Sequence, residues 1–274
     1  MITTATTTMI PALKALWKEA FEDTDEYTNF FFSHGFQPDR TFLYLQEERP
    51  VSMAFVFPGE LCVHDGYIPV GYIYGVATSK DSRGKGYSTK VLKYIQQQYP
   101  ISFLVPSSES LFQFYAKNGY HTAFHVNEVQ FHLEQLTKPD SQILTQDITP
   151  DEYKAIRDNY FHGAGYLRWN KSTITYALAE NVLFNGAAIK VKTPLADLTE
   201  AILLYRCYKQ ELIIKETTLS GKLLQDTAYS LMEKTKTNIC RIRLRPDSSS
   251  PKKAFAMLHG QEGITSGYCN LVLD

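Results

Sequence analysis

Residues 76–89, with the sequence VATSKDSRGKGYST, constrain the fold of this chain more than any other stretch. An apolar run precedes them and an amphipathic run follows, which predicts a strand and a helix joined by a short loop. Glycine lets backbone N–H groups approach an anion, and the first N–H groups of a helix lack intrahelical acceptors. Arg83 and Lys85 add positive charge beside the positive end of the helix dipole. The stretch therefore predicts a binding site for a diphosphate.

Two other phosphate-binding loops do not fit this stretch. A Walker loop needs glycine where the chain has Ser79, and serine or threonine where it has Gly86. A dinucleotide-binding fingerprint needs a third glycine where the chain has Thr89. An ordinary surface turn between a strand and a helix remains open as an alternative.

Two runs resemble motifs of the GNAT N-acetyltransferase superfamily. Residues 83–88 (RGKGYS) resemble its acetyl-CoA loop, Gln/Arg-x-x-Gly-x-Gly/Ala, and depart from it at Ser88. Residues 111–120 (LFQFYAKNGY) are similar to its Phe-Tyr-x-x-x-Gly-Phe segment, with Tyr120 in the final aromatic place. Together, these runs make the chain similar to an acetyl-CoA-dependent enzyme.

The resemblance implies which residues form the site. Tyr115 would be the general acid that protonates the departing CoA thiolate. The alternative is a tyrosine packed in the core, with its hydroxyl bonded to a neighbour. Ser108 stands where many members have an asparagine that contacts the cofactor. The implied contacts with acetyl-CoA, the co-substrate, are Val76, Ala77, Thr78, Arg83, Gly84, Lys85, Gly86, Tyr87, Ser88, Thr89 and Ser108.

The order of predicted elements extends the resemblance through about residue 134. Apolar spacing predicts an opening helix through Phe21, and Asp23 and Glu26 form a candidate capping box for a second helix. Strands are then predicted at residues 41–46, 50–57 and 60–64, with a hairpin turn at Asp65-Gly66. The strand of the cofactor site, a helix, a strand, a helix and a strand complete the GNAT order.

The second half repeats this order without the motifs. Residues 137–148 read as a linker, and a capping box at Thr149 and Glu152 starts a new helix. Predicted elements follow as helices 151–160 and 170–182, strands 187–192, 201–208 and 211–216, helix 219–234 and strand 238–244. Residues 217–222 lack the phosphate loop, and residues 255–260, aligned with 114–119, place Ala256 where Tyr115 stands.

The predicted fold is therefore α/β (α+β), with two tandem GNAT-like domains. Each has a mixed, mainly antiparallel sheet flanked by helices. The predicted domains are a catalytic domain at residues 1–136 and a degenerate copy at residues 149–274. This arrangement is similar to Eis-like (enhanced-intracellular-survival) acetyltransferases, without the sterol-carrier-like domain that those chains carry after the second copy.

The resemblance implies an N-acetyltransferase that moves the acetyl group to a primary amine by direct attack in a ternary complex. The acceptor is a small molecule or a peptide, and aromatic residues within 27–36 are candidates to line its pocket. The candidate bases are Glu60, His64, Asp65 and Glu109. In Eis-like proteins the C-terminal carboxylate serves as the base, and here it would belong to Asp274. A non-catalytic acyl-CoA-binding regulator is the alternative function.

Composition excludes several other classes of protein. The formal net charge of −1 argues against a nucleic-acid-binding protein. No apolar run is long enough to span a membrane, so we expect a cytoplasmic protein, and a homo-oligomer is compatible with the sequence. Four widely spaced cysteines predict reduced core residues. His121, His125 and His132 lie in a predicted strand, which argues against a metal site.

Overall fold

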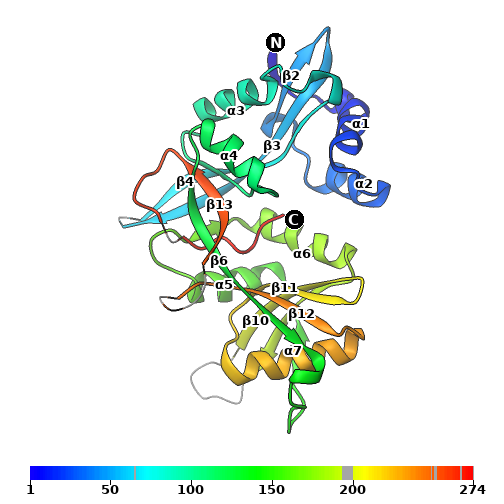
Figure 1. The fold of residues 1–274 in the computed structure, drawn as a ribbon, viewed down its shortest axis with the longest axis vertical. Helices are drawn as coiled ribbons and strands as arrows, with labels where there is room; N and C mark the ends of the chain where they lie inside the picture. The colour runs from blue at the N-terminus through cyan, green and yellow to red at the C-terminus, as the bar shows by residue number, and fades with distance from the viewer. Residues whose placement is uncertain (65, 193–199, 248, 250–251, 266, 274) are drawn as a thin grey trace. The chain divides into compact units, whose positions relative to one another are not determined.

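The computed structural model describes all residues except 65, 193–199, 248, 250–251, 266 and 274 (Figure 1). It divides into two compact units, each made of two chain segments. The first contains Met1–Phe124 and Phe255–Thr265, and the second contains His125–Ala254 and Ser266–Asp274. The domains predicted from the sequence, residues 1–136 and 149–274, are continuous segments, whereas each of these units also contains a second segment from elsewhere in the chain.

The first unit is a mixed sheet with helices on both faces. Its strands lie in the order β1 (Ile2–Thr4), β2 (Thr41–Gln46), β3 (Arg49–Val63), β4 (Gly66–Thr78), β5 (Ser102–Leu104), β13 (Lys253–His259) and β6 (His121–His132). Its helices are α1 (Ile10–Phe21), α2 (Asp25–His34), α3 (Tyr87–Gln98) and α4 (Glu109–Lys117). Two 3-10 turns, Pro38–Arg40 and Lys80–Ser82, precede β2 and α3.

Each face of this sheet has its own core. On one face Trp17 of α1 stacks on Phe31 of α2, with ring centroids 4.4 Å apart, and both rings pack against Phe55 of β3. On the other face α3 and α4 cover an apolar cluster that includes Val91, Ile95, Leu104 and Tyr115. The aromatic residues expected to line an acceptor pocket, Tyr27, Phe31, Phe32 and Phe36, are buried.

The second unit repeats this layered arrangement. Its strands lie in the order β6, β12 (Ile239–Leu244), β11 (Glu211–Thr217), β10 (Glu200–Tyr208), β9 (Ala187–Lys192) and β7 (Thr145–Asp147), and β8 (Leu167–Trp169) lies off this path. Helix α7 (Gly221–Thr235) covers one face through Leu224, Ala228 and Leu231. Helix α5 (Pro150–Tyr160) packs on β10, and α6 (Lys171–Leu183) packs on β9 and β10. The predicted α/β class with a GNAT-like order of elements is confirmed.

Several local predictions need correction. The capping residue of α2 is Thr24 instead of Asp23, because the Thr24 side chain accepts a hydrogen bond from the Tyr27 N–H. The two strands predicted at residues 50–57 and 60–64 are one strand, β3, because Pro58 and Gly59 stay in register with β4. Strand β1 was not predicted, and Asp65 of the predicted hairpin turn lies outside the described residues.

The largest correction concerns residues 255–260. They were aligned with the helix that carries Tyr115, but residues 255–259 belong to strand β13, and Gly260 follows its end. This strand pairs antiparallel with β5, with Met257 opposite Leu104 and His259 opposite Ser102. A strand in this place cannot be the counterpart of α4, so Ala256 is not a replaced catalytic tyrosine.

Candidate functional site

The site predicted from the sequence begins at a bulge in β4. Met53 and Phe55 of β3 pair with Ala77 and Tyr74 of β4, so β4 has one more residue than β3 between these pairs. Gly75 lies within the bulge at φ 60°, and a Cβ there would lie 2.9 Å from Phe55 Cδ2 and 3.0 Å from Trp17 Cζ3. Such a bulge interrupts the ladder and re-aims backbone groups. Val76, Ala77 and Thr78 follow at the end of the strand.

Strands β4 and β5 separate after Tyr72, before the bulge. They pair in parallel through Gly71–Ser102 and Tyr72–Phe103, and β4 then continues to Thr78 without further pairing to β5. Ser52 of β3 holds the other side of β4, because its Oγ donates to the Ala77 carbonyl at 2.9 Å and lies 3.0 Å from Thr78 Oγ1. The end of β4 is therefore fixed on the β3 side and unpaired on the β5 side.

The loop after β4 presents a series of free backbone amides. Gly84 and Gly86 have φ values of 74° and 75°, with no atom within 4 Å of where a Cβ would stand. Gly86 precedes α3, which has no side-chain cap. In the described chain, the first intrahelical bond at this end runs from Lys90 N to Gly86 O, and no acceptor bonds the N–H groups of residues 84–89. Lys85, Tyr87, Ser88 and Thr89 all lie in this stretch, so the arrangement suits an anion.

Side chains hold the loop in this conformation. Arg83 Nε donates to the Thr78 carbonyl at 3.2 Å, which ties the loop to the end of β4. Tyr87 stacks on Tyr44 of β2, with ring centroids 4.3 Å apart, and the Lys90 ammonium lies 5.3 Å from the Tyr44 ring. The predicted loop residues are therefore brought together around one helix N-terminus.

Tyr115 lies on the buried face of α4. Its side chain is 6% exposed and belongs to the apolar cluster that also contains Ile73 of β4 and Leu104 of β5, where these strands separate. Its hydroxyl forms no hydrogen bond with any described residue. Burial, and then the neighbouring Tyr120, raise the pKa of the Tyr115 phenol well above its ordinary value. The phenol therefore keeps its proton at neutral pH, as a proton donor requires.

The candidate cofactor contact Ser108 and the candidate bases lie in several separate places. Ser108 caps α4, where its side chain accepts from the Leu111 N–H at 3.4 Å. Glu60 pairs with Pro69, nine residues from Thr78 along β4, and His64 lies next to the hairpin turn. At about 3.3 Å per residue, this pair lies tens of ångströms from the bulge. Glu109 is in the first turn of α4, and Asp65 and Asp274 lie outside the described residues.

The structure adds to the candidate site a carboxylate that the sequence analysis had assigned only to a helix cap. Asp23 lies at the corner between α1 and α2, where its Oδ2 accepts from Trp17 Nε1 at 2.9 Å. The opposite edge of the same indole, at Cζ3, is the part that approaches Gly75 in the bulge. Burial raises the pKa of Asp23, although the Trp17 hydrogen bond opposes this shift. A nearby pair of phenols, Tyr27 and Tyr74, has its oxygens 2.6 Å apart. The sequence indicates only a capping role for Asp23, because its bond to Trp17 is a tertiary contact.

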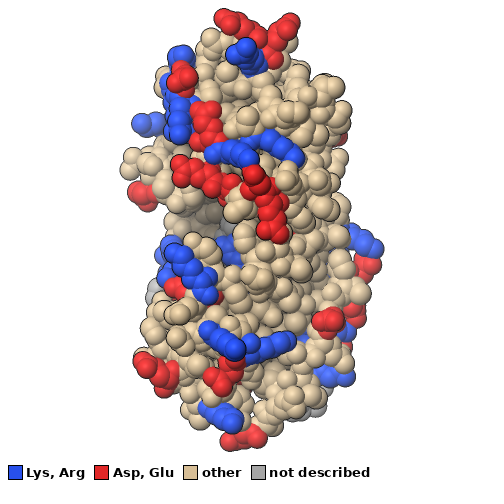
Figure 2. All heavy atoms as spheres, turned by 90° about the vertical axis from the view of Figure 1, so that its right-hand side faces the viewer, with Lys and Arg blue, Asp and Glu red and all other residues tan. Residues whose placement is uncertain are grey.

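Neither the surface charge in Figure 2 nor the metal-ligating side chains of the described residues indicate a further functional site. On the face drawn in Figure 2, basic and acidic side chains are interspersed instead of segregated by sign. Within the described ranges, no group of three or more His, Cys, Asp or Glu residues could hold a metal ion. No described helix has the length and apolar character needed to cross a membrane. All four cysteines are free thiols, and Cys240 and Cys269 are buried.

Comparison with known proteins identifies the first unit. Residues 1–123 match the family model described as an acetyltransferase (GNAT) domain. These residues are a GNAT acetyltransferase domain. The match contains the bulged strand, the loop and Tyr115, so it covers the part of the chain in which both sequence motifs lie. No curated protein matches the sequence.

Solved structures share the fold over both units of this chain. A GCN5-related N-acetyltransferase from Anabaena variabilis ATCC 29413 is 16% identical, with a TM-score of 0.71 over 94% of this chain and 72% of that chain. A probable N-acyltransferase from Enterococcus faecalis V583 is 16% identical, with a TM-score of 0.68 and the same coverage. Eis1 from Mycobacterium abscessus is 10% identical, with a TM-score of 0.65 over 94% and 73%. The predicted similarity to tandem, Eis-like proteins is confirmed for the fold.

Proposed function

We propose that the first unit transfers an acetyl group from acetyl-CoA to a primary amine. The observation that carries this proposal is the coincidence of three features in one unit: the free amides of residues 84–89, the bulged and unpaired end of β4, and the Tyr115 hydroxyl without a protein partner. The pyrophosphate would bind the amides, and Arg83 and Lys85 would add charge. The thioester would then lie along residues 76–78.

The transfer needs no covalent intermediate on the enzyme. The neutral amine attacks the acetyl carbonyl, and a new C–N bond forms as the carbonyl oxygen gains negative charge. Backbone N–H groups near Val76–Thr78 would stabilise this oxyanion. The intermediate then collapses, the C–S bond breaks, and the thiolate takes a proton from Tyr115. The ammonium of the attacking nitrogen loses its proton to solvent, so the products are the amide and CoA.

The acceptor would enter on the α1 and α2 side of the sheet. Asp23 is half-buried there and is linked to the bulge through a single indole ring. We propose that its carboxylate attracts the ammonium group of the acceptor. Asp23 is a better candidate for contact with the amine than Glu60 and His64, the candidate bases from the sequence, because both lie at the far end of the β3–β4 hairpin.

The second unit would have no acetyl-transfer site of its own, and the catalytic domain would be the first unit. Residues 217–222 contain one glycine, Gly221, and no arginine. A regulator that binds acyl-CoA without turnover is the competing function, in which Tyr115 is only a packed side chain.

A thermal-shift measurement tests cofactor binding. Acetyl-CoA at a hundred times its dissociation constant should stabilise the protein by about 2.7 kcal/mol, whereas NAD should not. The double variant Arg83→Ala/Lys85→Ala should lose this stabilisation. Lys117→Ala/Lys138→Ala removes the same charge at two exposed positions outside the loop and should keep it. No shift with millimolar acetyl-CoA would contradict the proposal.

Tyr115→Phe distinguishes the enzyme from the regulator. The variant keeps the ring in its cluster and removes the proton donor, so turnover with an amine acceptor should fall about 10²–10⁴-fold. The acetyl-CoA-induced thermal shift should not change. Turnover equal to that of the wild type would remove Tyr115 from the mechanism.

A further inference from the structure

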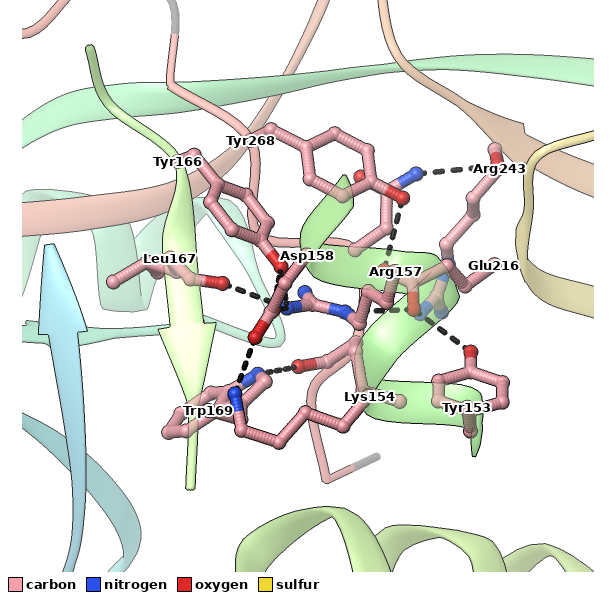
Figure 3. Close-up of polar contacts among 12 residues, drawn as sticks. Tyr153, Lys154, Arg157, Asp158, Tyr166, Leu167, Trp169, Glu216, Arg243 and Tyr268 are labelled. Atoms are coloured by element: carbon pink, nitrogen blue, oxygen red, sulfur yellow. Dashed lines mark hydrogen bonds and ion pairs between the residues drawn. The ribbon is translucent and has the colours of Figure 1, made fainter. Parts of the chain in front are cut away.

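A buried polar network occupies the second unit (Figure 3). Arg157 of α5 and Glu216 of β11 are both 0% exposed, and Arg157 Nε lies 2.9 Å from Glu216 Oε2. The hydroxyls of Tyr153 and Tyr268 donate to the same carboxylate at 2.7 and 2.9 Å. Arg157 Nη1 also donates to the Leu167 carbonyl at 2.9 Å. Glu216 is therefore the common acceptor of an arginine and two phenols.

One of these phenols belongs to the C-terminal segment. Residues 268–273 are buried within the chain, and the Tyr268 backbone bonds to both Gly165 and Leu167. Trp169 Nε1 donates to the Leu271 carbonyl at 2.8 Å. The segment is therefore fixed through main-chain and side-chain bonds over several residues.

The segment bridges two strands that separate. Strands β11 and β12 pair in parallel through Ile214–Ile242, and β11 then continues to Thr217 without further pairing to β12. The C-terminal segment bonds both strands beyond this point. The Tyr268 hydroxyl donates to Glu216 on β11, and Asn270 Nδ2 donates to the Arg243 carbonyl on β12 at 3.1 Å. In the first unit, the corresponding place between β4 and β5 is where we propose the thioester.

The same segment follows directly on a strand of the first unit. β13 ends at His259, and Tyr268 comes nine residues later. Within the first unit, β13 borders β5, and Met257 belongs to the cluster that contains Tyr115. His259 Nδ1 lies 3.1 Å from the Pro100 carbonyl, and Gly260 is so close to Pro100 that a Cβ would meet its oxygen at 1.9 Å. The end of β13 is therefore packed closely against Pro100, and the chain then continues to Tyr268 of the C-terminal segment.

We propose that the network around Glu216 anchors the C-terminal segment and thereby holds β13 beside β5. Tyr268 and Glu216 are then positioning residues, which act on the Tyr115 cluster through the chain that leads back to β13. The place where β11 and β12 separate serves as the anchor point. The structural part of this proposal stands alone, and its catalytic consequence rests on the proposed function.

Hydrogen exchange of the full-length protein tests the anchor. Tyr268→Phe removes one hydroxyl from the network and keeps the ring. Exchange should become about ten-fold faster, or more, both in residues 267–273 and in β13, whereas β10 keeps wild-type protection. Tyr160→Phe makes the same change at an exposed tyrosine of α5 and should leave all three segments unchanged. Faster exchange in residues 267–273 with wild-type protection in β13 would overturn the proposal.

A second variant and a kinetic readout keep the two proposals separate. Asn270→Leu removes the bond to Arg243 and should show the same paired loosening, to a smaller extent. With an amine acceptor, both variants should lower kcat and leave the KM for acetyl-CoA unchanged, because the phosphate loop is intact. Wild-type kcat with a loosened β13 would overturn the catalytic consequence. An inactive wild type would contradict the proposed function, and the exchange result would still decide the anchor.

Discussion

Strands β4 and β11 occupy equivalent places in the two units and share an irregularity. In β4 the extra residue lies between the partners of Met53 and Phe55, and in β11 it lies between the partners of Leu204 and Tyr205. In each strand the pairing with the parallel neighbour ends before this extra residue. The bulge and the separation are therefore properties of the GNAT fold, and they do not by themselves make a cofactor site.

The loops after these strands differ in where their polar groups are used. After β4 the amides of residues 84–89 have no protein acceptor in the described structure. After β11 the threonines bind back to the sheet: Thr217 Oγ1 donates to the Ile202 carbonyl at 2.9 Å, and Thr218 Oγ1 accepts from the Ile202 N–H at 3.0 Å. The Leu219 N–H donates to Thr217 Oγ1. The N–H groups of residues 220–223 also have no acceptor in the described structure, so unused amides alone do not distinguish the loops. The first loop differs in its longer unbonded run, residues 84–89, and in the arginine at position 83, which residues 217–222 lack.

The largest expected effect follows from removing Glu216. Glu216→Ala leaves the Arg157 charge buried without its partner, and two phenols lose their acceptor. Breaking a buried pair in this way should lower the free energy of unfolding by about 3–5 kcal/mol. A urea titration measures it. Lys222→Ala breaks an exposed pair with Asp226 in the same unit and should cost about 0.5 kcal/mol or less. A loss below about 1 kcal/mol for Glu216→Ala would show that the network does not support the second unit.

The sequence predicted the helices and strands of both units better than it predicted which strands pair and which side chains contact one another. The capping box at Thr149 and Glu152 located α5, and both of its hydrogen bonds form. Such signals are local, so a single sequence carries them. The apolar run of β13 does not say which sheet it joins, and Arg157 and Glu216 lie far apart in the sequence. Asp23 was assigned to a cap for the same reason, because its bond to Trp17 is visible only in the folded chain.

Two glycines give a smaller and sharper comparison. Gly86 and Gly221 begin equivalent helices with φ values of 75° and 56°, and at both positions the space where a Cβ would stand has no atom within 4 Å. Alanine at either position should cost about 1–2 kcal/mol of stability through left-handed strain. Only Gly86→Ala should weaken acetyl-CoA binding, by about ten-fold or more, because in our proposal the pyrophosphate binds the N–H groups of residues 84–89 beside Arg83 and Lys85. Titration calorimetry measures both affinities. Equal affinities in the two variants would place the cofactor elsewhere.

The smallest expected effect concerns the N-terminal caps of α1 and α5, the first helices of the two units. α1 begins without a side-chain cap, whereas Glu152 near the start of α5 accepts from the Thr149 N–H and from Lys190 Nζ. The Lys190 hydrogen bond, and then the Thr149 bonds, lower the pKa of Glu152 from 4.5 to about 2. A carboxyl group whose pKa is lowered in the folded state stabilises the fold at pH values above its ordinary pKa. This contribution disappears as the pH falls toward 2. The melting temperatures of the wild type and Glu152→Gln at low salt should therefore differ most above pH 5, and the gap should narrow steadily as the pH falls from 5 toward 2. A gap that stays constant over this range would mean that the cap, and not the carboxylate charge, distinguishes α5 from α1.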